Sequence, residues 1–365
     1  TKTYVEANFP GAKVRYGDSV TPDTPLLIRR NGTVETCRID SLVDSYEERD
    51  DGKQVAKIDA DVWTEKGFTP IRQIVRHKTT KTIHRVLTHT GIVDVTEDHS
   101  LLLENKEMIK PSEVTVGTQL LHGDCIHGLC WNDTTISVDE AKVMGFFFGD
   151  GSCGHYGGRY GMKHTWALNN TNLEYLVEMQ NLCPFETALY DTLESSGVYK
   201  LNAKGDVKSI CERYRGLFYN THKEKIVPSC ILNAPTEVVQ SFFDGYYMAD
   251  GDKGGFTRMD IKGKEGSMGF FILGRRLGYN VSINTRTDKP DVFRQTWTKS
   301  TQRKNTIAIK KLETMGETDG YVYDLTTESH HFHVGPGDLV VHNTDSVMVE
   351  FDVGERKGVE AIEYS

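Results

Sequence analysis

Two copies of one short pattern carry side chains suited to metal-assisted chemistry. Residues 143–151 read Val-Met-Gly-Phe-Phe-Phe-Gly-Asp-Gly, and residues 243–251 read Phe-Asp-Gly-Tyr-Tyr-Met-Ala-Asp-Gly. Small residues four apart lie on one helix face and let two helix backbones approach closely. Two such helices about a pseudo-twofold axis would bring Asp150 and Asp250 together, and carboxylates held so close repel unless a divalent cation lies between them. Such a cation can activate water and stabilise the leaving oxygen in phosphodiester hydrolysis.

The repeated pattern resembles that of the LAGLIDADG homing endonucleases over roughly residues 138–300. The resemblance implies an α/β endonuclease with pseudo-twofold symmetry that cuts double-stranded DNA and uses Mg2+ as its cofactor. Asp150 and Asp250 would be the metal ligands, and saddle-shaped sheets would lie in the DNA major groove. The alternative is a decayed insert in which both acids and their glycines serve only helix packing.

A lysine between the two copies extends this resemblance. Lys225-Ile226-Val227-Pro228 is similar to the Lys-x-x-Pro block that the family carries between its motifs. A lysine at that point can polarise water or stabilise phosphate charge, and we assign this role to Lys225. The family also implies a second basic residue after the second motif, for which Lys253, Lys262 and Lys264 all remain open.

The two ends of the chain carry a second set of reactive side chains. Removing residues 19–343 would join Tyr16-Gly17-Asp18 to Thr344-Asp345-Ser346, and the joined string YGDTDS resembles the metal-binding motif of family B DNA polymerases. The segment between them begins with Ser19, ends with His342-Asn343, and resembles an intein, which excises itself and ligates its flanks. The resemblance implies an all-β Hint splicing domain that needs no cofactor and acts on its own flanks.

At the upstream end, the Ser19 hydroxyl could attack the carbonyl of Asp18 and convert the amide to an ester. That shift is uphill, so the site must strain the peptide and stabilise the oxyanion. Thr96-Glu97-Asp98-His99 resembles the Thr-x-x-His block of inteins. The resemblance implies that His99 protonates the departing amide nitrogen and that Thr96 helps to hold the carbonyl.

At the downstream end, residues 322–332 resemble the penultimate intein block, and residues 340–344 resemble the last. The resemblance implies that Thr344 takes the acyl group from Ser19 and that Asn343 then cyclises to a succinimide and cuts its own peptide bond. A final ester-to-amide shift would leave the flanks joined. The side chains that would assist are His330 and His342 at the cyclisation, and Asp324, which would tune protons around Thr344.

Two residues depart from the usual intein pattern. Many inteins begin with Cys where this chain has Ser19, and an oxygen nucleophile is less reactive than a thiolate at neutral pH. The position after His330 is commonly Asn, and here it is His331. Both departures bear on the rate of splicing, and neither removes a step.

The flanks are too short to form a polymerase domain. Asp18 and Asp345 would bind the polymerase metals only after ligation, so polymerase function should be blocked before splicing. A rival hypothesis treats the whole chain as a piece of polymerase whose activity comes from the host gene. It would predict nucleotide polymerisation by the ligated flanks, which we do not expect.

The elements that must position these residues change type along the chain. Turn signals at Asn31-Gly32, Asp51-Gly52 and Thr90-Gly91 separate apolar, β-branched runs. The strands expected are 26–28, 34–39, 82–88 and 92–95, followed near the end by 306–310, 320–326, 331–334 and 338–341. The helices expected between them are 138–148, 171–182, 237–248 and 266–277. A β segment interrupted by an α/β insert predicts one domain nested in another.

These features predict five parts. Residues 1–18 and 344–365 would be the flanking exteins, residues 19–125 and 303–343 the two parts of the Hint domain, and residues 138–300 the endonuclease. Residues 261–300 contain eight Lys and Arg against three Asp and Glu, and a basic stripe there could meet phosphates, although a solvated face is equally compatible.

Composition excludes some classes of protein. A net charge of −9 argues against a uniformly basic nucleic-acid binder. The chain has no apolar run long enough to span a membrane and no signal peptide at its start, and its seven cysteines form no Cys-x-x-Cys pair. We therefore expect a reduced, intracellular protein. The resemblance to an intein within a polymerase further implies a monomer that accompanies a viral or microbial replication polymerase. Its DNA partner would be the intein-free site in the polymerase gene.

Overall fold

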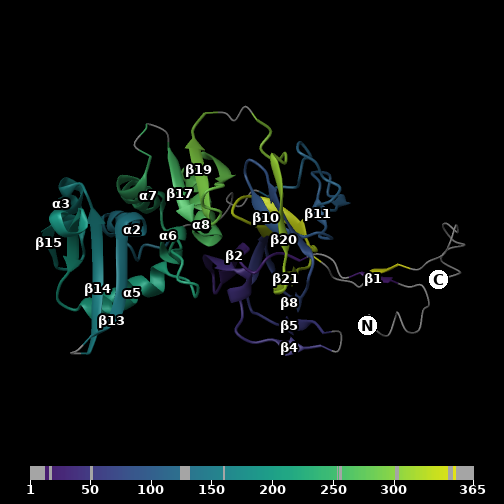
Figure 1. The fold of residues 1–365 in the computed structure, drawn as a ribbon, viewed down its shortest axis with the longest axis horizontal. Helices are drawn as coiled ribbons and strands as arrows, with labels where there is room; N and C mark the ends of the chain where they lie inside the picture. Colours follow the sequence, from purple (N-terminus) through teal and green to yellow (C-terminus); the bar gives the residue numbers. More distant parts are fainter. Residues whose placement is uncertain are drawn as a thin grey trace, which may run out of the picture.

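The computed structural model describes residues 13–15, 19–49, 52–123, 132–158, 161–252, 254, 257–300, 304–343 and 348–350. Figure 1 shows an α/β part beside a part built of strands, with strands β1 and β24 beyond the latter. The chain starts in the strand part, crosses into the α/β part before α2, and returns with β20. Thr344, Asp18, Asp345 and Lys253, named above as functional candidates, lie outside the described residues.

The strand part is completed by the end of the chain. Strand β20 (Lys311–Glu317) pairs with β9 (Thr82–Leu87), and β21 (Tyr321–Thr326) pairs with β8 (Gln73–Lys78). Its sheets are ordered β10-β9-β20, β21-β8-β5-β4, β12-β11-β23-β22 and β3-β2-β6-β7. The other strands are β2 (Pro25–Arg30), β3 (Thr33–Arg38), β4 (Glu47–Glu48), β5 (Gln54–Ala56), β6 (Asp61–Thr64), β7 (Gly67–Pro70), β10 (Ile92–Thr96), β11 (Leu101–Leu102), β12 (Met108–Ile109), β22 (His331–Val334) and β23 (Leu339–His342), with a 3-10 turn at Ile39–Ser41.

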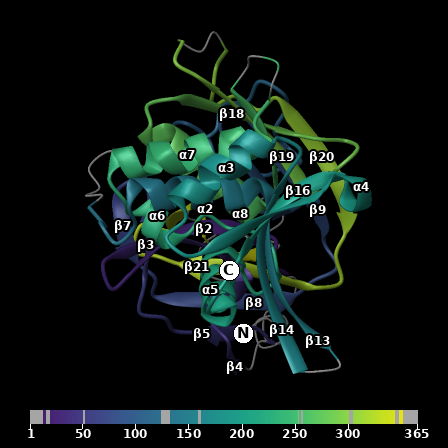
Figure 2. The ribbon, with the colours of Figure 1, turned by 90° about the vertical axis from the view of Figure 1, so that its left-hand side faces the viewer.

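The α/β part repeats a helix followed by a sheet. Helix α2 (Val138–Asp150) leads into the sheet β13-β14-β16-β15, and helix α7 (Thr236–Asp250) leads into β17-β19-β18. The first sheet has four described strands and the second has three, so the two halves are unequal. Figure 2 looks onto this part, with α2, α3 and α7 together and the long β13–β14 hairpin running away from them. The remaining elements are β13 (Gly151–Gly158), β14 (Gly161–Asn170), α3 (Leu173–Leu182), β15 (Thr187–Thr192), α4 (Leu193–Ser196), β16 (Val198–Ala203), α5 (Val207–Phe218), α6 (Ser229–Leu232), β17 (Arg258–Lys262), α8 (Lys264–Arg276), β18 (Asn280–Thr285) and β19 (Val292–Thr298).

Helices α2 and α7 touch backbone to backbone at their glycines. A Cβ added at Gly145 would lie 1.8 Å from the carbonyl oxygen of Phe242, and one added at Gly245 would lie 2.0 Å from that of Lys142. No side chain fits at either position, which is why small residues recur there. The close approach required by the repeated pattern is therefore present.

One apolar cluster joins the two parts of the molecule. It includes Phe147, Phe242 and Phe270 of the α/β part together with Leu27 and Ile92 of the strand part, all buried. A second cluster lies wholly inside the strand part. Buried apolar surface shared in this way stabilises the contact between the parts as well as each part itself.

Several expected elements differ from the observed ones. The strand expected at residues 306–310 is wrong: the segment makes one isolated bridge, Gln119↔Ala308, and the strand itself is β20. The segment pairs as a loop instead. The Ile309 N–H donates to the Thr118 carbonyl, and the carbonyls of Ile309 and Ile307 accept from the N–H groups of Gly117 and Leu120. Helix α8 begins at Lys264, earlier than the expected 266, and α5 was not among the expected helices. Among the described residues, no helix is long and apolar enough to cross a membrane.

Candidate splice and nuclease sites

The upstream candidate, Ser19, is buried in the strand part. Val20 forms antiparallel bridges to Val95 on one side and to Tyr323 on the other, so the segment after Ser19 lies between β10 and β21. The carbonyl of Ser19 accepts hydrogen bonds from the Thr96 backbone N–H at 3.0 Å and from the Thr96 hydroxyl at 3.4 Å. Thr96 therefore holds the carbonyl of Ser19 itself, whereas the carbonyl expected to be attacked belongs to Asp18.

The downstream candidate, Asn343, is fully buried at the end of β23. Its backbone N–H donates to the carbonyl of His330 at 2.8 Å, and its side-chain Nδ2 donates to the Thr327 hydroxyl at 3.3 Å. Thr327 in turn donates to the carbonyl of His331 at 2.8 Å. Among the described residues, Oδ1 of Asn343 has no hydrogen-bond partner. The side-chain amide is thus held by its nitrogen in a site closed to water.

One five-residue segment, Thr96–Ser100, touches both ends. Thr96 holds the Ser19 carbonyl, and the carbonyl of Ser100 accepts from the His342 backbone N–H at 3.4 Å. Between them, His99 is fully buried, and its backbone N–H donates to the Thr96 carbonyl at 2.9 Å. Pairing of Leu101 with Val341 continues the contact into β23. The segment therefore brings two residues more than 300 positions apart into one region.

Three histidines gather beside Asn343. The rings of His330 and His342 are stacked with centroids 6.2 Å apart, and His331 lies edge-on to His342 at 5.7 Å. His330 has a backbone φ of 60°, the left-handed region that costs energy for a residue with a side chain. Burial and the nearby imidazoles of His342 and His331 lower the pKa of His330. A neutral imidazole at neutral pH is suited to exchange protons.

His331 occupies the position where Asn is common in the resembled family. Its Nδ1 lies 2.8 Å from Oε1 of Glu65, a residue of the loop after β6. Burial opposes ionisation of Glu65, but the hydrogen bond with His331, a backbone hydrogen bond and the charge of Lys106 together outweigh it and lower the pKa of Glu65. His331 is thus fixed by a carboxylate.

Asp324 lies next to the residue that pairs with Val20. It is buried on β21, and its Oδ1 accepts from the Leu325 N–H at 2.8 Å. The neighbouring Tyr323 exchanges backbone hydrogen bonds with Val20 at 2.8 and 3.0 Å. Asp324 therefore belongs to the strand that borders the Ser19 segment.

The chain on either side of these ends also pairs. Strands β1 (Lys13–Arg15) and β24 (Met348–Glu350) form an antiparallel two-stranded ribbon in which residue 15 faces residue 348. The two flanks are therefore held as neighbours although 325 residues intervene between positions 19 and 343, counted inclusively.

The acids of the repeated pattern end the two central helices. Asp150 is the last residue of α2 and Asp250 the last of α7. A Cβ added at Gly149 would lie 2.8 Å from Cβ of Ala249 and 3.1 Å from Cβ of Asp250, so the helix ends meet. Oδ2 of Asp150 accepts a hydrogen bond from Asn170 on β14. The arrangement agrees with the expected placement of two carboxylates at one junction.

Lys225 reaches the same junction. Its Nζ donates to the carbonyls of Phe147, Phe148 and Gly151 at 2.8, 2.9 and 2.7 Å, around the C-terminal end of α2. Burial lowers the pKa of Lys225 to about 8, although the charges of Asp150 and Asp250 oppose the shift. This lysine caps the helix that carries Asp150, and it also lines a hollow of about 510 Å3 with Asp250.

The positions of Lys262 and Lys264 narrow the choice of the second basic residue of the endonuclease. Lys262 lines the hollow together with Lys225 and Asp250, and its Nζ lies 3.7 Å from Asp291. Lys264 instead reaches into the strand part, where its Nζ lies 2.7 Å from carboxylates of both Asp23 and Asp94. Of the two that the structure describes, only Lys262 lines the hollow that Asp250 also lines.

The donor set fits a magnesium ion shared with a substrate. Among the described residues, no group of three or more His, Cys, Asp or Glu side chains converges on one point. Mg2+ is commonly held by one or two carboxylates together with substrate phosphates and water. Asp150 and Asp250 supply the carboxylates, so the ion would be completed by a phosphodiester.

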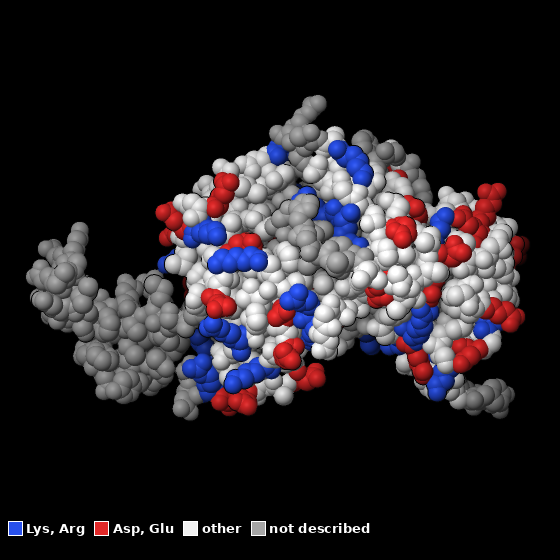
Figure 3. All heavy atoms as spheres, turned by 180° about the vertical axis from the view of Figure 1, so that it is seen from behind, with Lys and Arg blue, Asp and Glu red and all other residues white. Residues whose placement is uncertain are grey.

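Several Lys and Arg side chains of the basic stripe, residues 261–300, form ion pairs with acidic side chains. Asp260 pairs with both Arg286 and Arg294, the latter at 2.7 Å, and Lys299 donates to the carbonyl of Leu277. On the face shown in Figure 3, basic and acidic side chains are interspersed over both parts. The stripe is therefore not a bare basic surface.

Sequence reasoning missed two supporting residues, Thr327 and Glu65, and it considered Lys264 only for the endonuclease. Thr327 holds the Asn343 amide, Glu65 fixes His331, and Lys264 contacts the strand that carries Thr96. Only Thr327 lies within the block that resembles the intein ends. Glu65 and Lys264 come from distant segments, and no local pattern marks them.

Comparisons with known proteins agree with this organisation. The family model described as "Intein splicing domain" matches residues 27–343. A DNA polymerase of Acanthamoeba polyphaga mimivirus is 44% identical over 390 residues, covering 98% of this chain, and this chain spans only 22% of that relative's length. A transcription factor IIB mini-intein structure covers 89% of this chain and 99% of its own, at 14% identity and a TM-score of 0.33. A structure of I-DmoI in complex with DNA and Ca covers 44% of this chain and 83% of its own, at 16% identity and a TM-score of 0.34.

Proposed function

The chain belongs to the intein splicing domain family, and from that premise we propose that residues 19–343 excise themselves and ligate residues 1–18 to residues 344–365. The contact of Thr96–Ser100 with both ends carries this proposal, because splicing needs two distant junctions in one site. The paired flanks β1 and β24 support it, since ligation needs the two exteins side by side. Proximity of this kind replaces an encounter between separate reactants.

The upstream step would begin at Ser19. Its hydroxyl oxygen attacks the Asp18 carbonyl carbon, the hydroxyl proton is removed, and the C–N bond breaks as His99 protonates the departing nitrogen. Thr96 would fix the peptide plane that follows Ser19 through its two hydrogen bonds to the Ser19 carbonyl. Asp324 would assist the transfer of the acyl group from the Ser19 oxygen to Thr344.

The downstream step would belong to Asn343. Its side-chain nitrogen, held by Thr327, attacks its own carbonyl carbon and releases the amine of Thr344, leaving a succinimide. His330 and His342 would move the protons of this step. Burial of the site would protect the ester from water before the succinimide forms.

Intact mass spectrometry of the purified chain at neutral pH tests this proposal. We expect a product of residues 19–343 together with one peptide that joins residues 1–18 to 344–365. Asn343→Ala should stop release at the downstream junction, so that branched or upstream-cleaved species accumulate. Normal ligation by that variant would contradict the assignment of Asn343.

We propose as a second activity that the α/β part cuts double-stranded DNA at the intein-free site of the host gene. The two helix ends that join Asp150 and Asp250 beside Lys225 support this activity. A bound Mg2+ would activate water and neutralise the developing phosphate charge. Asp150 and Asp250 would hold it, and Lys225 would fix the end of the helix that carries Asp150.

The nuclease half is tested with a plasmid that carries the intein-free sequence. Wild-type protein should linearise it in Mg2+, and Asp150→Asn should abolish cleavage while splicing continues. Asp244→Asn is the matched control, because Asp244 lies on helix α7 but accepts a hydrogen bond from Gln240 and does not line the hollow that Asp250 lines. A wild-type protein that never cuts the plasmid would leave an insert with a structural role only.

We propose that the host is a family B DNA polymerase of viral origin. The mimivirus relative and the joined string YGDTDS support this host. Asp18 and Asp345 would bind the polymerase metals only after ligation. Splicing would then be required before the polymerase becomes active.

A further inference from the structure

Lys264 occupies a position that α8 itself does not favour. It is the first residue of the helix and is only 5% exposed. A cation in the first turn of a helix opposes the helix dipole. A buried ammonium group also loses its hydration and must be compensated by partners. The placement therefore points to a requirement outside α8.

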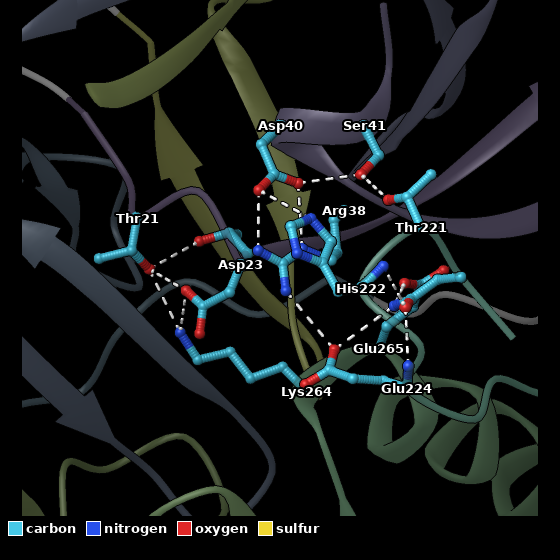
Figure 4. A network of polar contacts seen from close by, with 12 residues as sticks. Thr21, Asp23, Arg38, Asp40, Ser41, Thr221, His222, Glu224, Lys264 and Glu265 are labelled. Atoms are coloured by element: carbon cyan, nitrogen blue, oxygen red, sulfur yellow. Dashed lines mark hydrogen bonds and ion pairs between the residues drawn. The ribbon is translucent and has the colours of Figure 1, made fainter. Parts of the chain in front are cut away.

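Among the described residues, the three polar partners of Lys264 all lie in the strand part. Its Nζ is 2.7 Å from Oδ1 of Asp23, 2.7 Å from Oδ2 of Asp94, and 3.2 Å from the hydroxyl of Thr21. Figure 4 shows the lysine extending to Thr21 and Asp23 from the helix side. The ammonium group thus bridges the segment after Ser19 to strand β10.

These partners belong to the two segments that hold Ser19. The Thr21 N–H donates to the Asp94 carbonyl at 3.1 Å, and two residues farther along β10 Thr96 donates to the Ser19 carbonyl. Lys264 therefore binds side chains of both segments in the same antiparallel register that places Thr96 opposite Ser19. A shift of one segment against the other would move the Ser19 carbonyl away from Thr96.

Charge makes the bridge necessary. Asp94 also binds Arg85, whose Nε and Nη2 each donate to one carboxylate oxygen of Asp94 at 2.7 Å. Burial opposes ionisation of Asp94, but Lys264 and Arg85 outweigh it and lower the pKa of Asp94 to about 2. Asp23 and Asp94 face the same ammonium group, and without it their like charges would repel across the two segments.

We propose that Lys264 is a positioning residue for the first splicing step, so that the inserted α/β part completes the upstream splice site. The inference rests on the proposed splicing function. It assigns Lys264 to the splicing reaction instead of to DNA cleavage. It also gives the insert a role in splicing that is separate from any nuclease activity.

The test measures the two junctions separately. In an Asn343→Ala background, the Asp18 acyl group is held as an ester on Ser19 or Thr344, and hydroxylamine releases residues 1–18 from either ester. In a Ser19→Ala background, only cleavage after Asn343 remains. Lys264→Met is expected to slow hydroxylamine cleavage by about ten- to a hundredfold. It should leave downstream cleavage unchanged, and Lys264→Arg, which keeps the positive charge, should recover most of the upstream rate.

Asn233→Ala is the matched control. Asn233 of the α/β part exchanges hydrogen bonds with the backbone of Val34 in the strand part at 2.7 and 3.1 Å, away from Ser19. Its loss should loosen the contact between the parts without slowing upstream cleavage. Equal slowing of both junctions by Lys264→Met, or equal upstream slowing by Asn233→Ala, would overturn the inference. A parent with Asn343→Ala that yields no hydroxylamine cleavage would overturn the proposed splicing step and the inference with it.

Discussion

At the scale of single residues, the splice site is a set of polar groups enclosed by strands. Ser19, Thr96, His99 and Asn343 are all buried. Enclosure keeps water from the ester that splicing would form, and it makes each hydrogen bond count for more than it would at the surface. Proton transfer in such a place depends on histidines whose pKa values suit neutral pH.

Downstream cleavage should depend on pH through His330. Its pKa is lowered from 6.5, so its imidazole stays neutral at pH 6.5 and gains a proton only at lower pH. If it accepts a proton from the Asn343 amide, cleavage in a Ser19→Ala background should hold from pH 8 to pH 6.5 and fall below that. His330→Ala should slow cleavage by about a hundredfold or more. Gel analysis against His155→Ala, a histidine on β13, checks this, and an unchanged rate for His330→Ala would contradict it.

Glu265 should make stability fall as pH rises. Burial raises the pKa of Glu265 from 4.5 to about 7. The folded protein therefore keeps a proton that the unfolded chain releases, and the penalty is absent below pH 4.5 and complete above pH 7. Glu265→Gln should stabilise the protein at pH 8 by as much as about 3 kcal/mol, with no gain at pH 4. Urea unfolding at both pH values measures this effect. The exposed Glu212→Gln should show no such dependence.

At the scale of elements, the junction of α2 and α7 depends on the absence of side chains. The carbonyls of Phe242 and Lys142 lie where the Cβ atoms of Gly145 and Gly245 would be. Each acid at the end of these helices is placed by that contact. A change in the helix spacing would separate the two carboxylates as well as weaken the core.

Gly145→Ala should therefore destabilise the protein by about 1–3 kcal/mol or more and abolish DNA cleavage. Gly216→Ala is the control, because Gly216 lies in α5 with open space around its Cβ position. That change should stabilise the protein by about 0.5–1 kcal/mol, since alanine favours a helix interior. Thermal unfolding and plasmid cleavage measure the two effects. A stable, active Gly145→Ala protein would contradict the role of the close approach.

At the scale of the whole molecule, the two parts share one core. Leu27, Val34, Leu87 and Ile92 of the strand part pack in the same apolar cluster as the helices of the α/β part. Lys264 and Asn233 add polar contacts across the same boundary. A boundary of this kind links the stability of one part to that of the other.

Thermal unfolding should consequently show a single cooperative transition. Domains joined by small polar interfaces usually unfold or move independently, whereas a shared apolar core resists that. Differential scanning calorimetry of a chain with both Ser19→Ala and Asn343→Ala, in which neither junction should be cut, measures the number of transitions. Lys264→Met should lower the midpoint without splitting the transition. Two well-separated transitions would contradict the shared core.

The sequence by itself determined the nesting of one domain in another, and it predicted the reactive residues. Ser19, His342-Asn343 and the two Gly-Asp repeats are local patterns, and local patterns survive in a string of letters. It also predicted the close helix contact, because only small residues four apart allow it. The expected strand at 306–310 failed, since alternating isoleucines can serve a loop as well as a sheet.

Only the tertiary structure decided how distant residues meet. The capping of α2 by Lys225, the pairing of Glu65 with His331, and the reach of Lys264 to Asp94 each join segments far apart in the chain. Such contacts depend on long-range packing and on charges that find partners once water is excluded, and neither leaves a periodic signal in the sequence. For that reason only the fold shows that Lys264, one of the three lysines considered as the second basic residue of the endonuclease, contacts the strand that carries Thr96.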